Sequence, residues 1–405
     1  MFLTRIVEDV VRNDGARVLA GLIRLAGDFE TAEDALQEAY TRALETWSRD
    51  GIPETPGAWL NTVARRIVLD RLRRVSRTTE LPEELPAPDE VTEDEHAIED
   101  DRLRLLFTCC HPALAPEARC GLALRTLGGL STREIARAFV EPEPTTAQRL
   151  VRAKKKIREA RIPYEVPSRE KLPERVATVL SVLYLVFNEG YASTDAPSLL
   201  RPDLTAEAIR LARLTVELLP EQAEAKGLLA LMLLTDARRA ARMSSDGELV
   251  PLEEQDRTLW NRAQIDEGVR IIDDVLAERT PGPYQIQAAI AALHAQATTA
   301  AETDWRQIAA LYETLLRFLP TPVVELNAAV AMGMATSAER ALERIAKIDL
   351  PHYHLLPAAK ADLLRRLGRC DEAATAYVEA LELATNPAER RYLQRRLRQL
   401  SGETI

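Results

Sequence analysis

Apolar residues along this chain recur every three to four positions, and Val, Ile, Tyr and Phe never alternate with polar residues over a strand length. In residues 35–47, for example, Ala35, Ala39, Ala43 and Trp47 fall on one face of a helix. Alanine and leucine dominate, and aromatic residues make up only 5% of the chain. This pattern is typical of helices and not of strands. The sequence therefore predicts an all-α protein.

The helix that carries this apolar face also has a polar side. Thr31 and Asp34 fit a capping box, which predicts that the helix begins there. Asp34, Gln37 and Glu38 fall on the side away from the alanines. The helix is thus amphipathic, with an acidic polar side.

A second helix is predicted over residues 58–74, after a turn at 51–57. Its apolar stripe has helical spacing and consists of Trp59, Leu60, Val63, Ala64, Ile67 and Val68. The other positions of this region carry one acidic residue, Asp70, and six arginines: Arg65, Arg66, Arg71, Arg73, Arg74 and Arg77. Ion pairs among Arg66, Asp70 and Arg74 at four-residue spacing would make this an ordinary solvated face. A surface that follows phosphates accounts for six arginines more economically.

Two short helices separated by a tight break follow near residues 131–158. Ser131, with Glu134 three residues later, predicts a capped helix after a glycine-containing turn. The Glu-Pro-Glu-Pro run at 141–144 then breaks the chain, and Thr145 is the expected N-cap of the next helix. Two such helices make a helix-turn-helix.

In that motif the second helix enters the major groove with its first turn against base edges. The candidates for base contacts are Thr145, Thr146, Gln148 and Arg149, since Gln pairs with adenine and Arg with guanine. Arg152 and Lys154 follow at positions suited to phosphates. Leu150, Val151 and Ile157 are expected to face the core of the motif. A basic helical hairpin without any role at DNA is the alternative.

The net charge of −10 hides an uneven distribution along the chain. Residues 78–101 hold eleven acidic residues, no basic ones and three prolines, which predicts a flexible linker. The rest of residues 1–162 holds 25 basic and 17 acidic residues, whereas residues 163–405 hold 28 basic and 35 acidic ones. Two basic modules are thus joined by an acidic tether. The tether is a solvated spacer or a competitor of DNA for the basic faces.

Residues 28–158 resemble an extracytoplasmic-function (ECF) sigma factor of the σ70 type. The resemblance rests on AEDALQEAYTRALETW, WLNTVARRIVLDRLRR and LSTREIA…PTTAQRLVRAKKKI, which occur in the family's order. It implies that residues 1–77 are region 2, which binds core RNA polymerase and the −10 element. Residues 102–162 would then be region 4, whose helix-turn-helix binds the −35 element of promoter DNA.

The resemblance also implies roles for single residues. Asp34, Gln37 and Glu38 would meet the clamp helices of the polymerase. The −10 strand would be met by Arg65, Arg66, Asp70, Arg71, Arg73 and Arg74. Arg66 departs from the family, which commonly carries Asn at this position. The identity of the flipped base of the −10 element is therefore left undefined. Pro144 precedes the recognition helix, at a position where Gly is frequent in the family.

The C-terminal region, residues 163–405, contains three similar segments that start at Glu207, Gln307 and Glu372. The third resembles a tetratricopeptide repeat, with Gly368, Ala373, Tyr377 and Ala380 at its packing positions. An irregular helical bundle is the alternative. With motifs such as FTCCHPAL and VLYLVFNEGY, the whole chain resembles the ECF subgroup with a long tetratricopeptide-like extension. In that subgroup the extension is thought to regulate activity, so a regulatory protein or a ligand could bind it.

Other chemistries find little support. Cys109, Cys110, His111 and Cys120 lack zinc-ligand spacing, and the three cysteines are expected to be buried thiols. His294 and Asp304 have no nucleophile beside them, so catalytic residues, metals and cofactors are not expected. A set of polar residues within apolar motifs is expected to fix helix packing, or else to line a groove: Glu189, Tyr191, Gln255, Asp256, Arg257, Tyr284 and Gln287.

The predicted function is that of a non-enzymatic sigma factor with two helical DNA- and polymerase-binding domains and a tetratricopeptide-like domain. No signal peptide or membrane span is evident, which predicts a cytoplasmic protein without a membrane partner. Two alternatives stay open. One is a helix-turn-helix regulator that acts without core polymerase, and the other is a tetratricopeptide scaffold.

Overall fold

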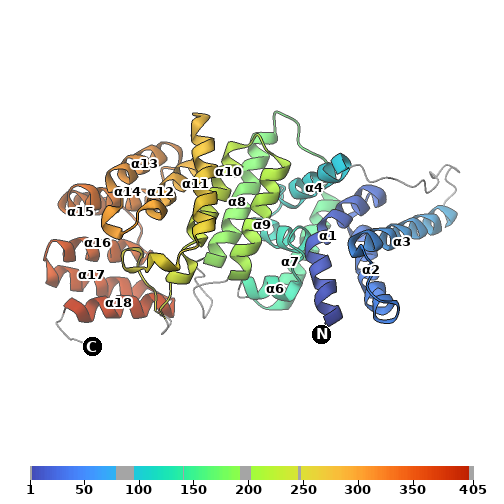
Figure 1. The fold of residues 1–405 in the computed structure, drawn as a ribbon, viewed down its shortest axis with the longest axis horizontal. Coiled ribbons are helices and arrows are strands. Elements are labelled where there is room, and N and C mark those ends of the chain that lie inside the picture. Colours follow the sequence, from blue (N-terminus) through green and yellow to red (C-terminus); the bar gives the residue numbers. More distant parts are fainter. Residues whose placement is uncertain (1, 79–94, 140, 192–201, 245–247, 401–405) are drawn as a thin grey trace. The chain divides into compact units, whose positions relative to one another are not determined.

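The computed structural model describes residues 2–78, 95–139, 141–191, 202–244 and 248–400, and these residues are almost entirely helical (Figure 1). Within them, extended pairing is confined to one bridge between Met243 and Leu249. The chain divides into two compact units, Met1–Val186 and Phe187–Ile405. The all-α prediction is confirmed. Among the described helices, none is both long and apolar enough to cross a bilayer.

The first unit begins with three mutually packed helices, α1 (Phe2–Ala26), α2 (Phe29–Asp50) and α3 (Pro56–Thr78). The start of α2 differs from the predicted capping box. Asp28 is the N-cap, and its carboxylate accepts hydrogen bonds from the backbone N and the hydroxyl of Thr31, both at 2.7 Å. Gly27 precedes it with φ +67°, a conformation that costs glycine little and turns the chain between α1 and α2. Thr31 therefore lies inside the first turn, and Asp34 is an exposed helix residue.

Five further helices begin in the first unit: α4 (Glu95–Cys109), α5 (Pro116–Thr126), α6 (Thr132–Ala138), α7 (Glu143–Glu159) and α8 (Leu172–Tyr191). The predicted linker at 78–101 lies mostly outside the described residues, but its last part, 95–101, is the start of α4. The capping box of α6 is confirmed, because the backbone N of Ser131 donates to Glu134 and the N of Glu134 donates back to the Ser131 hydroxyl.

The second helix of the helix-turn-helix begins earlier than predicted. Its N-cap is Pro142, not Thr145. Pro144 lies in the first turn of the helix, where the backbone φ of proline fits and the N–H that it lacks would have no intrahelical partner. The Glu-Pro-Glu-Pro run therefore starts α7 as well as ending the preceding turn.

The chain just after residue 162 packs with the first unit, which ends later than the predicted change of domain. The Tyr164 hydroxyl lies 3.0 Å from the carbonyl oxygen of Ala20 and 2.9 Å from that of Asp101. Arg175, on α8, donates to the carbonyl of Phe107 and lies over its ring. The boundary at Val186 and Phe187 falls inside α8.

The second unit consists of paired helices. They are α9 (Pro202–Leu218), α10 (Ala223–Asp236), α11 (Arg262–Ala277), α12 (Pro283–Gln296), α13 (Trp305–Phe318), α14 (Pro322–Ala335), α15 (Ala338–Ile345), α16 (Leu355–Arg366), α17 (Cys370–Leu383) and α18 (Pro387–Leu400). Short 3₁₀ turns lie between them: η1 (Arg239–Ala241), η2 (Leu252–Glu254), η3 (Arg257–Leu259) and η4 (Ala300–Glu302). The three similar sequence segments correspond to the pairs α9–α10, α13–α14 and α17–α18, each packed together.

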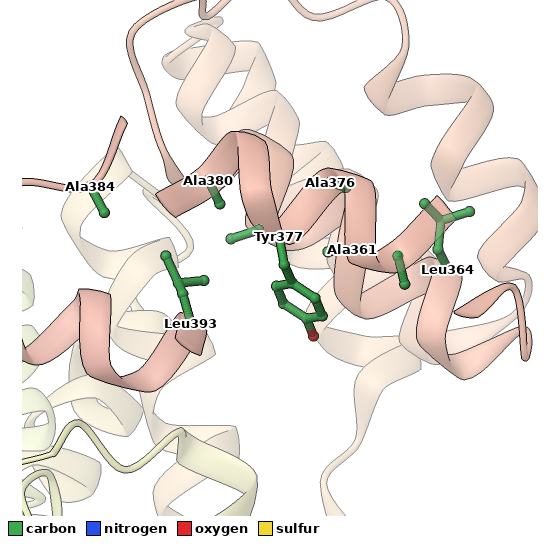
Figure 2. Packing of buried hydrophobic residues seen from close by; sticks show 9 residues of the cluster. Ala361, Leu364, Ala376, Tyr377, Ala380, Ala384 and Leu393 are labelled. Atoms are coloured by element: carbon green, nitrogen blue, oxygen red, sulfur yellow. The ribbon is translucent and has the colours of Figure 1, made fainter. Parts of the chain in front are cut away.

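One core cluster illustrates how these pairs pack (Figure 2). Tyr377 of α17 is fully buried among small residues, including Ala361 of α16 and Ala380 of its own helix. Its hydroxyl donates to the carboxylate of Asp362 at 2.6 Å. Small residues let the helix backbones approach while one large ring fills the space between them. The predicted packing roles of Ala373, Tyr377 and Ala380 agree with this burial, and the tetratricopeptide likeness remains an interpretation.

Candidate nucleic-acid interface

Helix α7 presents one polar face outward and one apolar face inward. Leu150, Ala153 and Ile157 are buried. Thr145, Gln148 and Arg152 are exposed on the outer side, where three- and four-residue steps bring them into line. The prediction that Val151 faces the core is wrong, since 63% of its surface is exposed. An apolar side chain therefore lies among the polar residues of the outer face.

Two of the predicted base-contact residues are held by Glu141, which precedes the helix. The hydroxyl of Thr146 donates to the Glu141 carboxylate at 2.7 Å, and Thr146 is only 1% exposed. This burial removes Thr146 from the candidate DNA surface, because its hydroxyl is already satisfied inside the module. Arg149 donates two hydrogen bonds of 2.5 Å to the two oxygens of the same carboxylate. Arg149 must leave this bidentate partner before it can pair with a base.

The arginine-rich helix α3 also has an exposed face. Arg66, Asp70, Arg73 and Arg74 are exposed, and Arg65 is half-buried. Asp70 pairs with Arg73 at 3.7 Å and three-residue spacing. The side chain of Arg77 lies outside the described residues. Helix α3 thus brings several guanidinium groups to one exposed surface, which can follow phosphates.

Arg71 differs from the other arginines of α3, because it crosses to the acidic side of α2. Its guanidinium lies 3.1 Å from Glu38 and 3.8 Å from Asp34. Burial raises the pKa of Glu38, but hydrogen bonds from Arg42 and Arg71 outweigh it and hold that pKa below its usual value. Asp34 and Gln37 remain exposed beside this cluster. Arg71 therefore orients the predicted polymerase-binding face.

Ion pairs also join α2 to α7. Glu33 of α2, whose side chain is 13% exposed, contacts Lys154, and Arg125 lies 3.7 Å away. Glu30 pairs with Arg158 at 2.6 Å. Lys154, a predicted phosphate contact, is thus occupied by a carboxylate. The sequence pattern did not predict that Glu33 and Glu141 hold basic residues of α7. Helical periodicity shows which residues share a helix face, and it does not show contacts of this kind.

The cysteine cluster is structural. Cys109, Cys110 and Cys120 are buried as predicted, and burial raises the pKa of Cys109 and of Cys120 to about 12. The Cys109 sulfur lies 3.0 Å from the hydroxyl of Thr126. Such thiols stay protonated and inert. Within the described residues, no three His, Cys, Asp or Glu side chains are grouped to hold a metal.

The remaining candidates lie in the second unit. Asp304 is the N-cap of α13 and accepts from the backbone N of Gln307, which is a structural role. Arg257 is buried and donates to the carbonyls of His294 and Ala297 at 2.7 and 2.6 Å, so it fixes helix packing as predicted. The Tyr191 hydroxyl accepts from Arg238 at 3.2 Å.

Comparison with known proteins finds similarity in both parts of the chain. A family model described as Sigma-70 region 2 matches residues 10–78, and a family of unknown function (DUF6596) matches residues 175–276. An uncharacterized protein of Rhizobium meliloti is 44% identical over 397 residues, covering 96% of this chain and 94% of that protein. The probable ECF RNA polymerase sigma factor SigI of Mycobacterium tuberculosis is 32% identical over 162 residues, covering 38% of this chain and 54% of SigI. The ECF RNA polymerase sigma factor SigL of the same species is 33% identical over 131 residues, covering 32% of this chain and 73% of SigL.

These findings define the class as σ70-type transcription initiation factors. The chain belongs to the ECF RNA polymerase sigma factor family, which is not enzymatic and which acts with core RNA polymerase at promoter DNA. Within that family it carries a long helical C-terminal extension, part of which matches the family of unknown function. The resemblance to an ECF sigma factor with a C-terminal extension is thereby confirmed, whereas the tetratricopeptide likeness of that extension stays a prediction.

Proposed function

We propose that this protein binds core RNA polymerase through the acidic side of α2 and directs initiation at promoters that α3 and α7 recognise. The observation that carries the proposal is the pair of exposed basic faces on α3 and α7, in a chain whose residues 10–78 match Sigma-70 region 2. Basic helices of this kind bind nucleic acid through phosphates, and their remaining side chains select the sequence.

Helix α7 supplies the selecting side chains for the −35 element. Gln148 pairs with adenine and Arg149 with guanine through two hydrogen bonds each. The exposed Val151 suits the methyl group of thymine, a contact that sequence periodicity did not reveal. Thr145 and Arg152 lie on the same exposed face and suit the adjacent backbone. Lys154 also contacts the DNA backbone once its ion pair with Glu33 is broken.

Helix α3 supplies the contacts with the −10 element. Its exposed residues Arg66, Arg73 and Arg74 bind the phosphates of the separated strand, with Arg65 beside them. Asp70 holds Arg73 and so shapes this surface. A flipped base costs a few kcal/mol to unstack, and contacts in this region offset that cost. Arg71 acts indirectly, because it binds Glu38 and Asp34 on the polymerase side.

Polymerase binding is tested by reversing charge on α2. Asp34→Lys combined with Gln37→Lys should reduce co-purification with core polymerase by about tenfold or more, equivalent to roughly 1.4 kcal/mol. Both residues are exposed, so the fold should persist. Glu54→Lys, an exposed acid in the turn before α3, is the matched control and should bind normally. If the unaltered protein binds a duplex but never core polymerase, it is a free-standing helix-turn-helix regulator instead.

We further propose that the C-terminal extension regulates the two basic modules. The support is its size, its acidic composition and its match to a distinct family at residues 175–276. Because α8 ends at Tyr191 and its first part packs with the first unit, the informative deletion removes residues 192–405 and not 163–405. We expect the run-off transcript yield with core polymerase to differ from that of the full chain. Equal yields over a range of protein concentrations would rule out this regulatory role.

A further inference from the structure

The second unit contains a cavity of about 640 Å³ to which the sigma-factor function assigns no role. Its walls come from helices α12, α13, α14, α16 and α18 and from the 3₁₀ turns η2, η3 and η4. Pockets for small molecules usually measure about 300–1,000 Å³ and form where several elements meet. The cavity therefore has the volume of a small-molecule site.

Arg257, in η3, lines this cavity although only 8% of its surface is exposed. Its Nη1 atom donates to the carbonyls of His294 and Ala297, and the guanidinium lies over Trp260, 4.5 Å from the ring centroid. Its Nε and Nη2 atoms donate to no described group and are not sealed from solvent. A guanidinium has five N–H donors, so Arg257 keeps further donors for a ligand.

Within the described residues, Arg257 has no carboxylate partner. Burial and the positive charges of Arg238 and Arg262 lower the pKa of Arg257, whereas the exposed Glu302, which lies beyond ion-pair distance, raises it. Arginine stays charged even so. A buried charge beside like charges, without a counter-ion of its own, is costly, and an anion at the cavity would relieve that cost.

The other charged residues of the wall are balanced. Glu253 pairs with Arg366 at 2.5 Å, and Asp362 lies 3.5 Å from Arg365. Four further residues complete this network and keep its acidic and basic groups equal in number: Glu248, Glu254, Arg395 and Arg396. Among the described residues that line the cavity, Arg257 is therefore the charged group without a counter-ion, and the wall has an excess of positive charge.

Most of the remaining wall is apolar or aromatic. Trp305 and Tyr353 contribute rings, and Leu326, Val330 and Leu355 contribute aliphatic surface. Leu355 is 43% exposed, so the cavity is open to solvent at this side chain. An apolar wall of this kind favours a ligand with an apolar body, because burying its surface releases water.

We propose that this cavity binds a small organic anion whose carboxylate pairs with the guanidinium of Arg257 and whose apolar body lies against the rings and aliphatic side chains of the wall. Hydrogen bonds between ionised partners are about twice as strong as neutral ones, so charge selects the ligand. An extended peptide fits less well, because its backbone polar groups would lie against apolar surface without partners. The proposal concerns the second unit alone and does not depend on polymerase or promoter DNA.

The test compares two dyes with the full chain. 8-Anilinonaphthalene-1-sulfonate is an anion, N-phenyl-1-naphthylamine is its uncharged counterpart, and both become fluorescent in apolar surroundings. We expect one anionic dye per chain to bind saturably and at least about tenfold more tightly than the uncharged dye, because it adds a charge-assisted pair to the same apolar contact. Decanoate should displace the anionic dye, and decylammonium, with a chain of the same length, should not.

Two variants locate the anionic dye. Arg257→Gln keeps a donor but removes the charge, and should weaken the anionic dye at least about tenfold while changing the uncharged dye little. Leu355→Glu places a carboxylate at the exposed side of the cavity and should weaken the anionic dye about fivefold relative to Leu355→Gln, which has the same size without the charge. Circular dichroism checks each fold, and if Arg257→Gln misfolds, Leu355→Glu decides.

The proposal is overturned by any of three results. The first is the absence of saturable binding of the anionic dye by the unaltered protein. The second is equal affinity for the two dyes, or displacement by decylammonium as effective as that by decanoate, since the charge would then select nothing. The third is anionic-dye affinity that neither Arg257→Gln nor Leu355→Glu changes, which would place the dye elsewhere.

Discussion

Replacing Gln148 and Arg149 together by alanine should abolish sequence-specific transcription by this sigma factor while leaving its polymerase binding intact. Both residues lie on α7, and neither approaches the acidic side of α2 that we assign to polymerase. Each base contact through two hydrogen bonds contributes about 1–3 kcal/mol of discrimination. Losing both should lower the preference for the cognate −35 sequence by about 30-fold to 10⁴-fold. Run-off transcription on cognate and scrambled promoters measures the change.

Two single variants make this result interpretable. Arg152→Ala removes a phosphate contact, so it should weaken binding to all sequences alike and reduce the salt dependence. Arg317→Ala alters an exposed arginine of α13 in the second unit and should have no effect. If the double variant still prefers the cognate promoter, α7 is not the recognition helix. Glu141→Gln tests the role of Glu141, because the neutral amide weakens the ion pair that holds Arg149.

Tyr377→Ala should cause the largest loss of stability in the second unit. The ring is fully buried between α16 and α17, and removing a buried aromatic ring costs about 3–5 kcal/mol through lost burial and the cavity left behind. We expect the free energy of opening, measured by hydrogen exchange at the amides of α17, to fall by that amount. This local measurement suits a chain of two units, whose overall unfolding need not be two-state.

Tyr377→Phe is the matched control. It keeps the ring and loses only the 2.6 Å hydrogen bond to Asp362, so its cost should be about 1.5–3 kcal/mol. If the alanine variant destabilises no more than the phenylalanine variant, then the packing seen in Figure 2 contributes little.

The sequence predicted those features that depend on local patterns. The helices and the cap formed by Ser131 and Glu134 follow from periodicity and from residue preferences at helix ends, and both are confirmed. The caps predicted at Thr31 and Thr145 were wrong, because Asp28 caps α2 three residues earlier and α7 already begins at Glu143, with Pro144 in its first turn. Local pattern alone does not decide between neighbouring starters.

Features that depend on distant residues could not be predicted. Lys154 and Glu33 are 121 positions apart, so no window of sequence links them. The same holds for Arg71, whose partners lie on α2. Val151 shows a related difficulty, because an apolar residue in a helix is normally assigned to the core, and only the packing reveals its exposure. The candidate base and phosphate contacts remain predictions that await the promoter experiments.

Helix α8 has a consequence for the evolution of such proteins. It begins in one compact unit and ends in the other without an interruption. Each residue added to a helix rotates everything that follows by about 100° and shifts it by about 1.5 Å. An insertion within α8 would therefore turn buried side chains that follow it, such as Val179 and Leu183, away from the face of the helix that is buried. Insertions and deletions should be rare between Leu172 and Tyr191, even where individual side chains vary freely.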